Sequence, residues 1–161
     1  MEAATAGAKA VVDKVVAAPA EVLYELVSDV TKMGRWSPET TSCRWLRPAT
    51  GPAVGARFRG ANRQGWRRWS TTCTVVSAQP GHQFAFEVTL GPLPISRWSY
   101  DIASEGDGSR LTETWTDMRP MWMVRISPVV MGVRDRAGHN REGMQATLAN
   151  LARAAEEVPS P

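Results

Sequence analysis

The chain has 161 residues, of which 43% are hydrophobic and 22% are charged, and its formal net charge is +3. This length and globular composition exclude wholesale disorder and a separate catalytic domain, so we expect one domain over residues 1–161 with an ordered core of about residues 8–157. With only two cysteines and two histidines, the chain offers little material for a disulfide framework, a metal site or a Ser-His-Asp triad, and we expect no cofactor.

The N-terminal part predicts one strand and two short helices. Residues 1–9 lack an apolar run after a basic start, so we expect no secretory signal and a cytoplasmic protein. The valine-rich segment Ala8–Ala17 predicts a strand. Pro19 suits the first turn of a helix, where its missing N–H costs nothing, and Asp29 suits the N-cap of a second short helix.

After Pro38 the hydrophobic pattern changes from helical spacing to alternation, and glycine and proline recur at turn-like intervals. This pattern is typical of a meander of antiparallel strands. We place the strands at Ser42–Arg47, Ala56–Arg63, Trp66–Ala78, Gln83–Thr89, Ile95–Ser104 and Arg110–Met118.

An arginine-rich segment lies within these strands, because the stretch from Thr40 to Phe86 contains no acidic residue. Such a surface is either a solvated face of the sheet or a place where phosphate groups dock. Its members are Arg44, Arg47, Arg57, Arg59, Arg63, Arg67 and Arg68.

Alternation along the strands predicts which side chains point inward, because successive residues of a strand face opposite ways. Arg57, Arg59 and Arg63 share one face, which must be the outside. By the same test, one face of the whole sheet is strongly aromatic. It carries Phe58, Trp69, Phe84, Phe86, Trp98, Tyr100 and Trp115 together with Gly60, Asn62, Thr71, Cys73, Val75, Val88, Ile102, Leu111 and Glu113.

The C-terminal part, Arg119–Val158, has helical spacing apart from Pro128, which should break or kink the helix. No apolar stretch here is long enough to span a bilayer. The methionine-rich segment Met118–Met131 is either a mobile lid or ordinary packing. Beyond Gly132, one apolar stripe predicts a helix that lies on the sheet, formed by Val133, Ala137, Asn140, Met144, Leu148 and Leu151.

The order of strand, two short helices, six strands and a long helix resembles the α+β helix-grip fold of the START-like or SRPBCC superfamily, in its polyketide cyclase/dehydrase-like branch. The resemblance is carried by Ala17–Val22, Trp36–Pro38, Val54–Gly60 with Arg68-Trp69, and Asn140–Met144 with Thr147-Leu148. It implies a curved antiparallel sheet of about seven strands around a long C-terminal helix, with a hydrophobic molecule held between them. It leaves the chemistry open.

Aromatic residues on the inward face are the first candidates for ligand contacts. Each could simply fill the core, but together they form rigid walls suited to flat or polycyclic ligands. With neighbouring residues they make the candidate set Trp45, Phe58, Trp69, Thr71, Phe84, Phe86, Trp98, Tyr100, Trp115, Trp122 and Met144.

Glu113 is the candidate catalytic residue, because it stands between Leu111 and Trp115 on the inward face. Burial there would raise its pKa and hold a proton for general acid or base chemistry, or for a hydrogen bond to a ligand. Alternatively, the carboxyl group only forms a structural hydrogen bond with a polar neighbour. Asn62 and Asn140 either contact the ligand or hydrogen-bond locally at the pocket edge.

The leading hypothesis is that the chain binds a small hydrophobic or aromatic ligand, lipid-like or polyketide-like, for carriage or sensing. The alternative is a polyketide cyclase, aromatase or dehydratase that uses Glu113, with substrate delivered by an acyl carrier protein on the arginine-rich face. Whether the chain is an enzyme stays open. Exposed aromatics are not interleaved with the arginines except at Trp66, so we expect no nucleic-acid partner.

Overall fold

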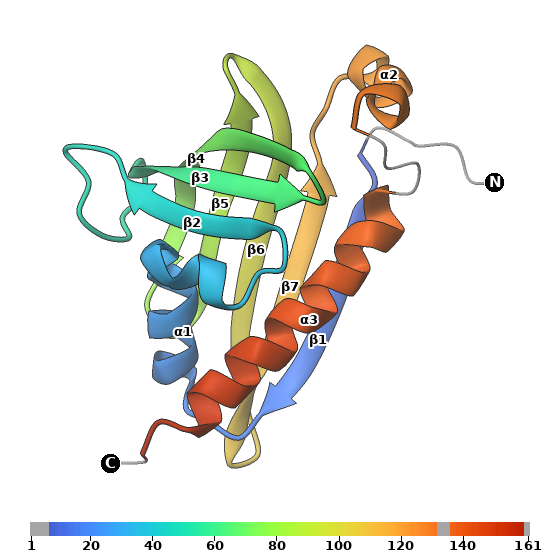
Figure 1. Cartoon of the computed structure of the whole chain (residues 1–161). Helices are drawn as coiled ribbons and strands as arrows, with labels where there is room; N and C mark the ends of the chain where they lie inside the picture. The colour runs from blue at the N-terminus through green and yellow to red at the C-terminus, as the bar shows by residue number, and fades with distance from the viewer. Residues whose placement is uncertain (1–6, 132–135, 160–161) are drawn as a thin grey trace.

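The computed structural model describes residues 7–131 and 136–159, and within them a single curved sheet dominates (Figure 1). The sheet has seven strands in the order β1-β7-β6-β5-β4-β3-β2, and every neighbouring pair is antiparallel. The strands are β1 (Lys9–Val16), β2 (Thr40–Trp45), β3 (Arg57–Gln64), β4 (Arg67–Gln79), β5 (Gln83–Leu90), β6 (Leu93–Glu105) and β7 (Gly108–Asp117).

Irregular pairings help to bend this sheet. The register shifts between Val75 and Ser77 on β4, and again between Val88 and Thr89 on β5. A β-bulge of this kind bends its strand and increases the local twist. As a result β2 and β3 run across the direction of β6 and β7, and the sheet forms a half-cup (Figure 1).

Two short helices connect β1 to β2, as the sequence predicts. Helix α1 covers Ala20–Ser28, and η1, a 3₁₀ helix, covers Val30–Arg35. The predicted N-cap is confirmed, because the side chain of Asp29 accepts a hydrogen bond from the backbone N–H of Thr31.

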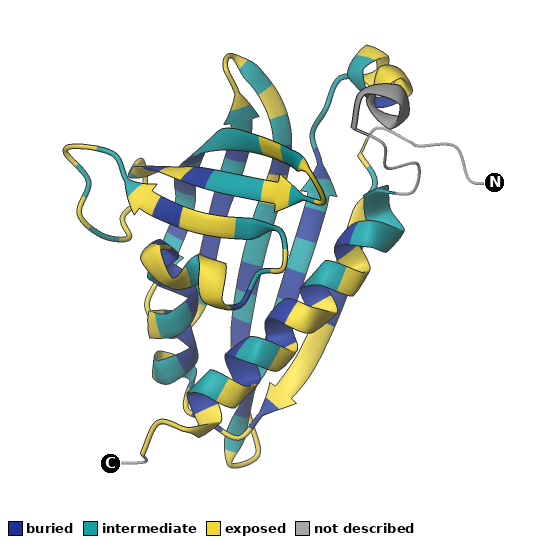
Figure 2. Cartoon of the chain, in the orientation of Figure 1, coloured by how far each residue is buried: buried dark blue, intermediate teal, exposed yellow. Residues whose placement is uncertain are grey.

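The long helix α3 (Arg136–Glu156) lies over the concave side of the sheet (Figure 1). Its buried residues recur at helical spacing and face the strands, as Figure 2 shows by the dark segments along α3. They include Asn140, Met144, Leu148 and Leu151, which confirms that part of the predicted stripe; Val133 lies outside the described residues. The helix-grip fold predicted from the sequence is therefore present.

Helix α2 (Met121–Met131) precedes α3 and continues past Pro128, so the proline does not end the helix. A proline removes a single helical hydrogen bond, which a helix can survive with a kink. On α2, Trp122 is 55% exposed and Val124 is fully buried. None of the described helices combines the length and the apolar composition needed to cross a membrane.

Alternation along the strands places the side chains as predicted. Arg57, Arg59 and Arg63 are exposed, whereas Phe58 and Gly60 between them are buried. The strand predicted at Ser42–Arg47 begins and ends two residues earlier in the structure, at Thr40 and Trp45.

Candidate functional site

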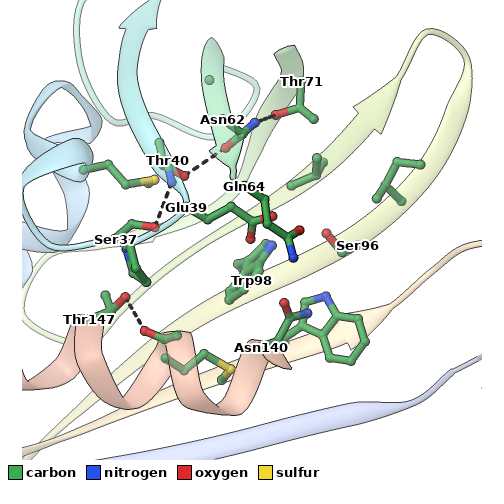
Figure 3. A pocket seen from close by; sticks show the side chains of 18 of the residues that line it. Ser37, Glu39, Thr40, Asn62, Gln64, Thr71, Ser96, Trp98, Asn140 and Thr147 are labelled. Atoms are coloured by element: carbon green, nitrogen blue, oxygen red, sulfur yellow. Dashed lines mark hydrogen bonds between the residues drawn. The ribbon is translucent and has the colours of Figure 1, made fainter. Parts of the chain in front are cut away.

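A pocket of about 540 Å³ opens between the concave face of the sheet and α3. We call it the sheet–helix pocket. Strands β3 to β7 supply its floor, α3 supplies one wall, and the segment Ser37–Thr40 supplies part of the rim. Figure 3 shows side chains from these three regions pointing into one space, with Trp98 near its centre.

Aromatic rings form much of the pocket wall, because the bent sheet turns alternate residues of several strands toward one centre. Phe58 and Phe86 meet edge to face with ring centroids 5.1 Å apart. Trp98 on β6 and Trp115 on β7 are cross-strand partners, and both line the pocket. The pocket therefore offers flat, apolar surfaces from adjacent strands.

Most of the ligand contacts predicted from the sequence lie around this pocket. Those that line it are Phe58, Asn62, Trp69, Thr71, Phe86, Trp98, Tyr100, Glu113, Trp115, Asn140 and Met144.

Three predicted contacts lie elsewhere. Trp45 packs edge to face on Phe58, with ring centroids 5.6 Å apart, and Phe84 is completely buried in the core. Trp122 stands on α2, beyond the end of β7 and largely in solvent (Figure 1). Alternation gave the correct face for Phe84, but it does not reveal where along a strand the packed core ends and the pocket begins.

Glu113 points inward and is only 2% exposed. Its Oε1 accepts a hydrogen bond of 2.9 Å from the hydroxyl of Tyr100, its cross-strand partner on β6. Burial raises the pKa of Glu113 to about 8, although the Tyr100 hydrogen bond opposes this shift. The carboxyl group is thus mostly protonated at neutral pH. Burial also raises the pKa of Tyr100 well above its usual value.

The two candidate asparagines differ in their partners. Asn62 accepts a hydrogen bond from the Thr40 hydroxyl at 3.0 Å and donates one to the Thr71 hydroxyl at 3.3 Å, as drawn in Figure 3. Asn140 projects from α3 into the pocket, and its buried Nδ2 has no hydrogen-bond partner among the described residues. Asn62 therefore makes structural hydrogen bonds at the edge of the pocket, whereas the Nδ2 of Asn140 is available to donate to a ligand.

Two ion pairs in the pocket wall were missed from the sequence. Arg136 on α3 contacts Glu39 with Nη2 and Oε1 3.3 Å apart, joining segments 97 residues apart. Arg119 holds the buried carboxylate of Asp117 through its Nε at 2.8 Å and its Nη2 at 2.5 Å. Alternation could have found Asp117, which shares the inward face of β7 with Glu113, but no local pattern predicts the Arg136 pair.

Cys43 and Cys73 are both free and buried. Burial raises the pKa of Cys43 to about 11 and of Cys73 to about 12, so both thiols are protonated and unreactive at neutral pH. No group of three His, Cys, Asp or Glu side chains gathers as a metal site in the part of the chain that the structure describes.

Comparison with known families is decisive for the lineage of this chain. The family described as polyketide cyclase / dehydrase and lipid transport matches residues 7–156. The chain belongs to this family. Its membership agrees with the sequence resemblance and with the helix-grip architecture. No curated protein matches the chain in sequence.

Solved structures of similar shape include other polyketide cyclase-like proteins. A polyketide cyclase-like protein from Corynebacterium glutamicum is 28% identical, with a TM-score of 0.58 over 92% of this chain and 89% of that one. The di-domain ARO/CYC protein StfQ from the steffimycin biosynthetic pathway is 14% identical, with a TM-score of 0.72 over 92% of this chain and 50% of StfQ.

The same fold occurs outside bacteria. Major latex-like protein 151 from Panax ginseng is 11% identical, with a TM-score of 0.70 over 94% of this chain and 99% of that one. At this level of identity the likeness to StfQ and to the ginseng protein concerns the fold alone. The family description itself spans both enzymes and carriers, so the chemistry of this polyketide cyclase-family member must be argued from its own pocket.

Proposed function

We propose that the chain binds a small hydrophobic or aromatic molecule in the sheet–helix pocket, for carriage or sensing. The observation that carries this proposal is a pocket of about 540 Å³ with aromatic walls. Pockets for small molecules commonly have 300–1,000 Å³ and combine apolar walls with a few placed polar groups. The tryptophans at positions 69, 98 and 115 provide such walls for a flat ligand.

A second candidate function is cyclase, aromatase or dehydratase activity. It is supported by Glu113, which is a protonated carboxylic acid inside the pocket at neutral pH. Such an acid could protonate a carbonyl or a leaving hydroxyl of a poly-β-keto chain. Tyr100 is already engaged as the donor to Glu113, so the site would depend on a single acid.

A carrier protein that delivered such a chain would suit the outer arginine-rich face. There Arg44 lies opposite Arg59, and Arg63 lies opposite Arg68, on neighbouring strands. Like charges directly opposite one another destabilise a sheet, so an acidic partner would reduce the electrostatic repulsion between these arginines. We propose an acyl carrier protein as that partner only for the enzymatic alternative.

Closing the pocket mouth tests the binding function without damaging the core. Gly143 on α3 lines the pocket, and a Cβ built there lies 3.6 Å from Pro38 Cγ on the opposite rim. Gly143→Leu should therefore obstruct the mouth, while leucine favours the helix more than glycine does. We expect anthracene-2-carboxylate to quench tryptophan fluorescence of the parent protein, with an affinity at least ~10-fold weaker in the variant.

Ala149→Leu is the matched control, because it adds the same side chain on the exposed side of α3. It should bind the probe as the parent does. Equal binding by all three proteins would place the probe outside the pocket and overturn the proposal. The enzymatic alternative is tested with Glu113→Gln, which should retain binding but lower turnover of a poly-β-keto substrate by roughly 10²-fold or more. Unchanged turnover in this variant would exclude Glu113 as the acid.

A further inference from the structure

Three buried side-chain atoms around the sheet–helix pocket lack hydrogen-bond partners in the described part of the chain. They are Oε2 of Glu113, Nη1 of Arg136 and Nδ2 of Asn140. All three residues line the pocket. Folded proteins pair nearly all of their buried polar atoms, because an unpaired one retains its desolvation cost. Three such atoms around one pocket indicate that their partners enter through it.

All three atoms act as donors at neutral pH. The amide nitrogen of Asn140 and the guanidinium nitrogen of Arg136 can only donate. With a pKa of about 8, the carboxyl group of Glu113 is mostly protonated, and because Oε1 accepts from Tyr100, Oε2 is the oxygen available to carry the proton. A matching ligand must therefore bring acceptor oxygens rather than donors.

The positions of the donors divide the pocket into two parts. Arg136 and Asn140 are four residues apart on α3, so they lie on the same side of the helix, one turn from each other. Glu113 lies on β7, one step along the inward face from Trp115. Asn140 reaches from the helix into the pocket, as Figure 3 shows. The helix thus offers a cation and an amide side by side, and the sheet offers a separate neutral acid.

A carboxylate fits the pair on α3. Glu39 occupies Nη2 of Arg136 but leaves Nη1 unpaired. One carboxylate has two oxygens, which can accept from Arg136 and Asn140 together, and charge-assisted hydrogen bonds of this kind are the stronger ones. A neutral carbonyl oxygen fits Glu113. The burial that keeps this acid uncharged would also disfavour an ionised ligand group beside it.

We propose that the natural ligand is a free aromatic or polycyclic carboxylic acid whose carboxylate binds Arg136 and Asn140 and whose ring carbonyl accepts from Glu113. This inference rests on the proposed binding function. The proposed ligand differs from a poly-β-keto chain held on an acyl carrier protein as a thioester, because a thioester has no free carboxylate to bind Arg136.

Three compounds separate the two interactions. Anthraquinone-2-carboxylate has both features, its methyl ester lacks the charge, and anthracene-2-carboxylate lacks the ring carbonyls. We expect the parent protein to bind the quinone acid at least ~10-fold more tightly than either of the other two, as measured by tryptophan quenching. Arg136→Gln should abolish the preference over the ester and keep the preference over the anthracene acid.

Asn140→Leu distinguishes a ligand contact from a structural role. Removing an unpaired buried donor should leave the melting temperature unchanged or higher, while affinity for the quinone acid falls about 10-fold. Asn150→Leu is the matched control, because Asn150 lies on the same helix but does not line the pocket, and its amide nitrogen donates to the backbone carbonyl of Trp36 at 3.0 Å. It should lower the melting temperature and leave the preference among the three compounds unchanged.

The pH dependence identifies the donor on the sheet. Above about pH 8 Glu113 ionises, so preference for the quinone acid over the anthracene acid should disappear in the parent. Glu113→Gln, whose amide always donates, should keep it. Tyr100 on β6 is the direct partner of Glu113, and β1 presents Val12 opposite it. The other titratable or charged residues that line the pocket are Glu39, Cys43, Arg63, Cys73, Arg119, Arg136, His139 and Glu142. His139→Gln should keep the parent's pH profile.

Two outcomes contradict different claims. Equal affinities for the acid and its ester, lost in Gly143→Leu, would overturn this inference and leave the binding function in place. Failure of all three compounds to bind would contradict both.

Discussion

Burial keeps the carboxyl group of Glu113 protonated at a pH at which a solvent-exposed glutamate would be ionised. The side chain is 2% exposed and its single described partner is the hydroxyl of Tyr100. Alternation in the sequence was sufficient to predict this position, because Leu111, Glu113 and Trp115 occupy one face of a strand. It was not sufficient for Arg136, whose partner Glu39 is brought close only by the packing of α3 against the rim.

The proton on Glu113 should make stability depend on pH. The carboxyl group loses its proton near pH 4.5 in the unfolded chain but near pH 8 in the folded one. Between these values the folded state binds more protons, so the free energy of unfolding falls as pH rises, by about 1.4 kcal/mol per pH unit. Urea unfolding at pH 5 and pH 8 should show a loss in the parent that Glu113→Gln lacks. Identical losses in both proteins would show that Glu113 is not protonated inside the folded chain.

Among the elements, η1 and β2 set the rim of the pocket through a close backbone approach at Gly34. A Cβ built on Gly34 would lie 2.3 Å from the carbonyl oxygen of Thr41. Glycine is therefore required where η1 meets the first residues of β2, and the rim segment Ser37–Thr40 lies between them. Composition and alternation predicted the two elements, but the contact depends on tertiary packing and has no signature in the local sequence.

Gly34→Ala should destabilise the chain by roughly 1–3 kcal/mol, because the added methyl group must displace backbone. Gly51→Ala provides the control, since no atom lies within 4 Å of a Cβ built there and its φ is not positive. Thermal unfolding of the two variants should differ accordingly. A Gly34→Ala protein as stable as the Gly51→Ala protein would refute the close contact between η1 and β2.

For the molecule as a whole, the sequence predicted the fold because a meander has mostly sequential pairing and its alternation is regular. The strand order follows the chain apart from β1, which pairs with β7. The size and contents of the pocket were less predictable, since they depend on how strongly the bulged sheet bends over α3. Hence the inward face was correct while Trp45, Phe84 and Trp122 proved to lie off the pocket.

The outer arginine-rich face should contribute to partner binding and not to ligand binding. Reversing the charge of Arg57 and Arg59 to glutamate turns the like-charge pair of Arg59 with Arg44 into an opposite-charge pair, and Arg63 is left unchanged because it also lines the pocket. We expect unchanged affinity for anthracene-2-carboxylate and a free energy of unfolding equal to or slightly above that of the parent, by about 0.2–1 kcal/mol for this pair. Salt-sensitive binding of an acidic carrier protein, if present, should be lost. A large loss of stability would contradict the exposed placement of these arginines.

The binding pocket itself is tested most directly by the tryptophan indole N–H resonances. The chain has seven tryptophans, of which Trp69, Trp98 and Trp115 line the pocket. During a titration with anthraquinone-2-carboxylate, ¹⁵N-edited NMR spectra should show shifts in these three resonances and none in Trp66 or Trp122, which stand exposed outside it. Shifts confined to Trp66 and Trp122, with the pocket resonances unmoved at saturation, would contradict a ligand site between the sheet and α3.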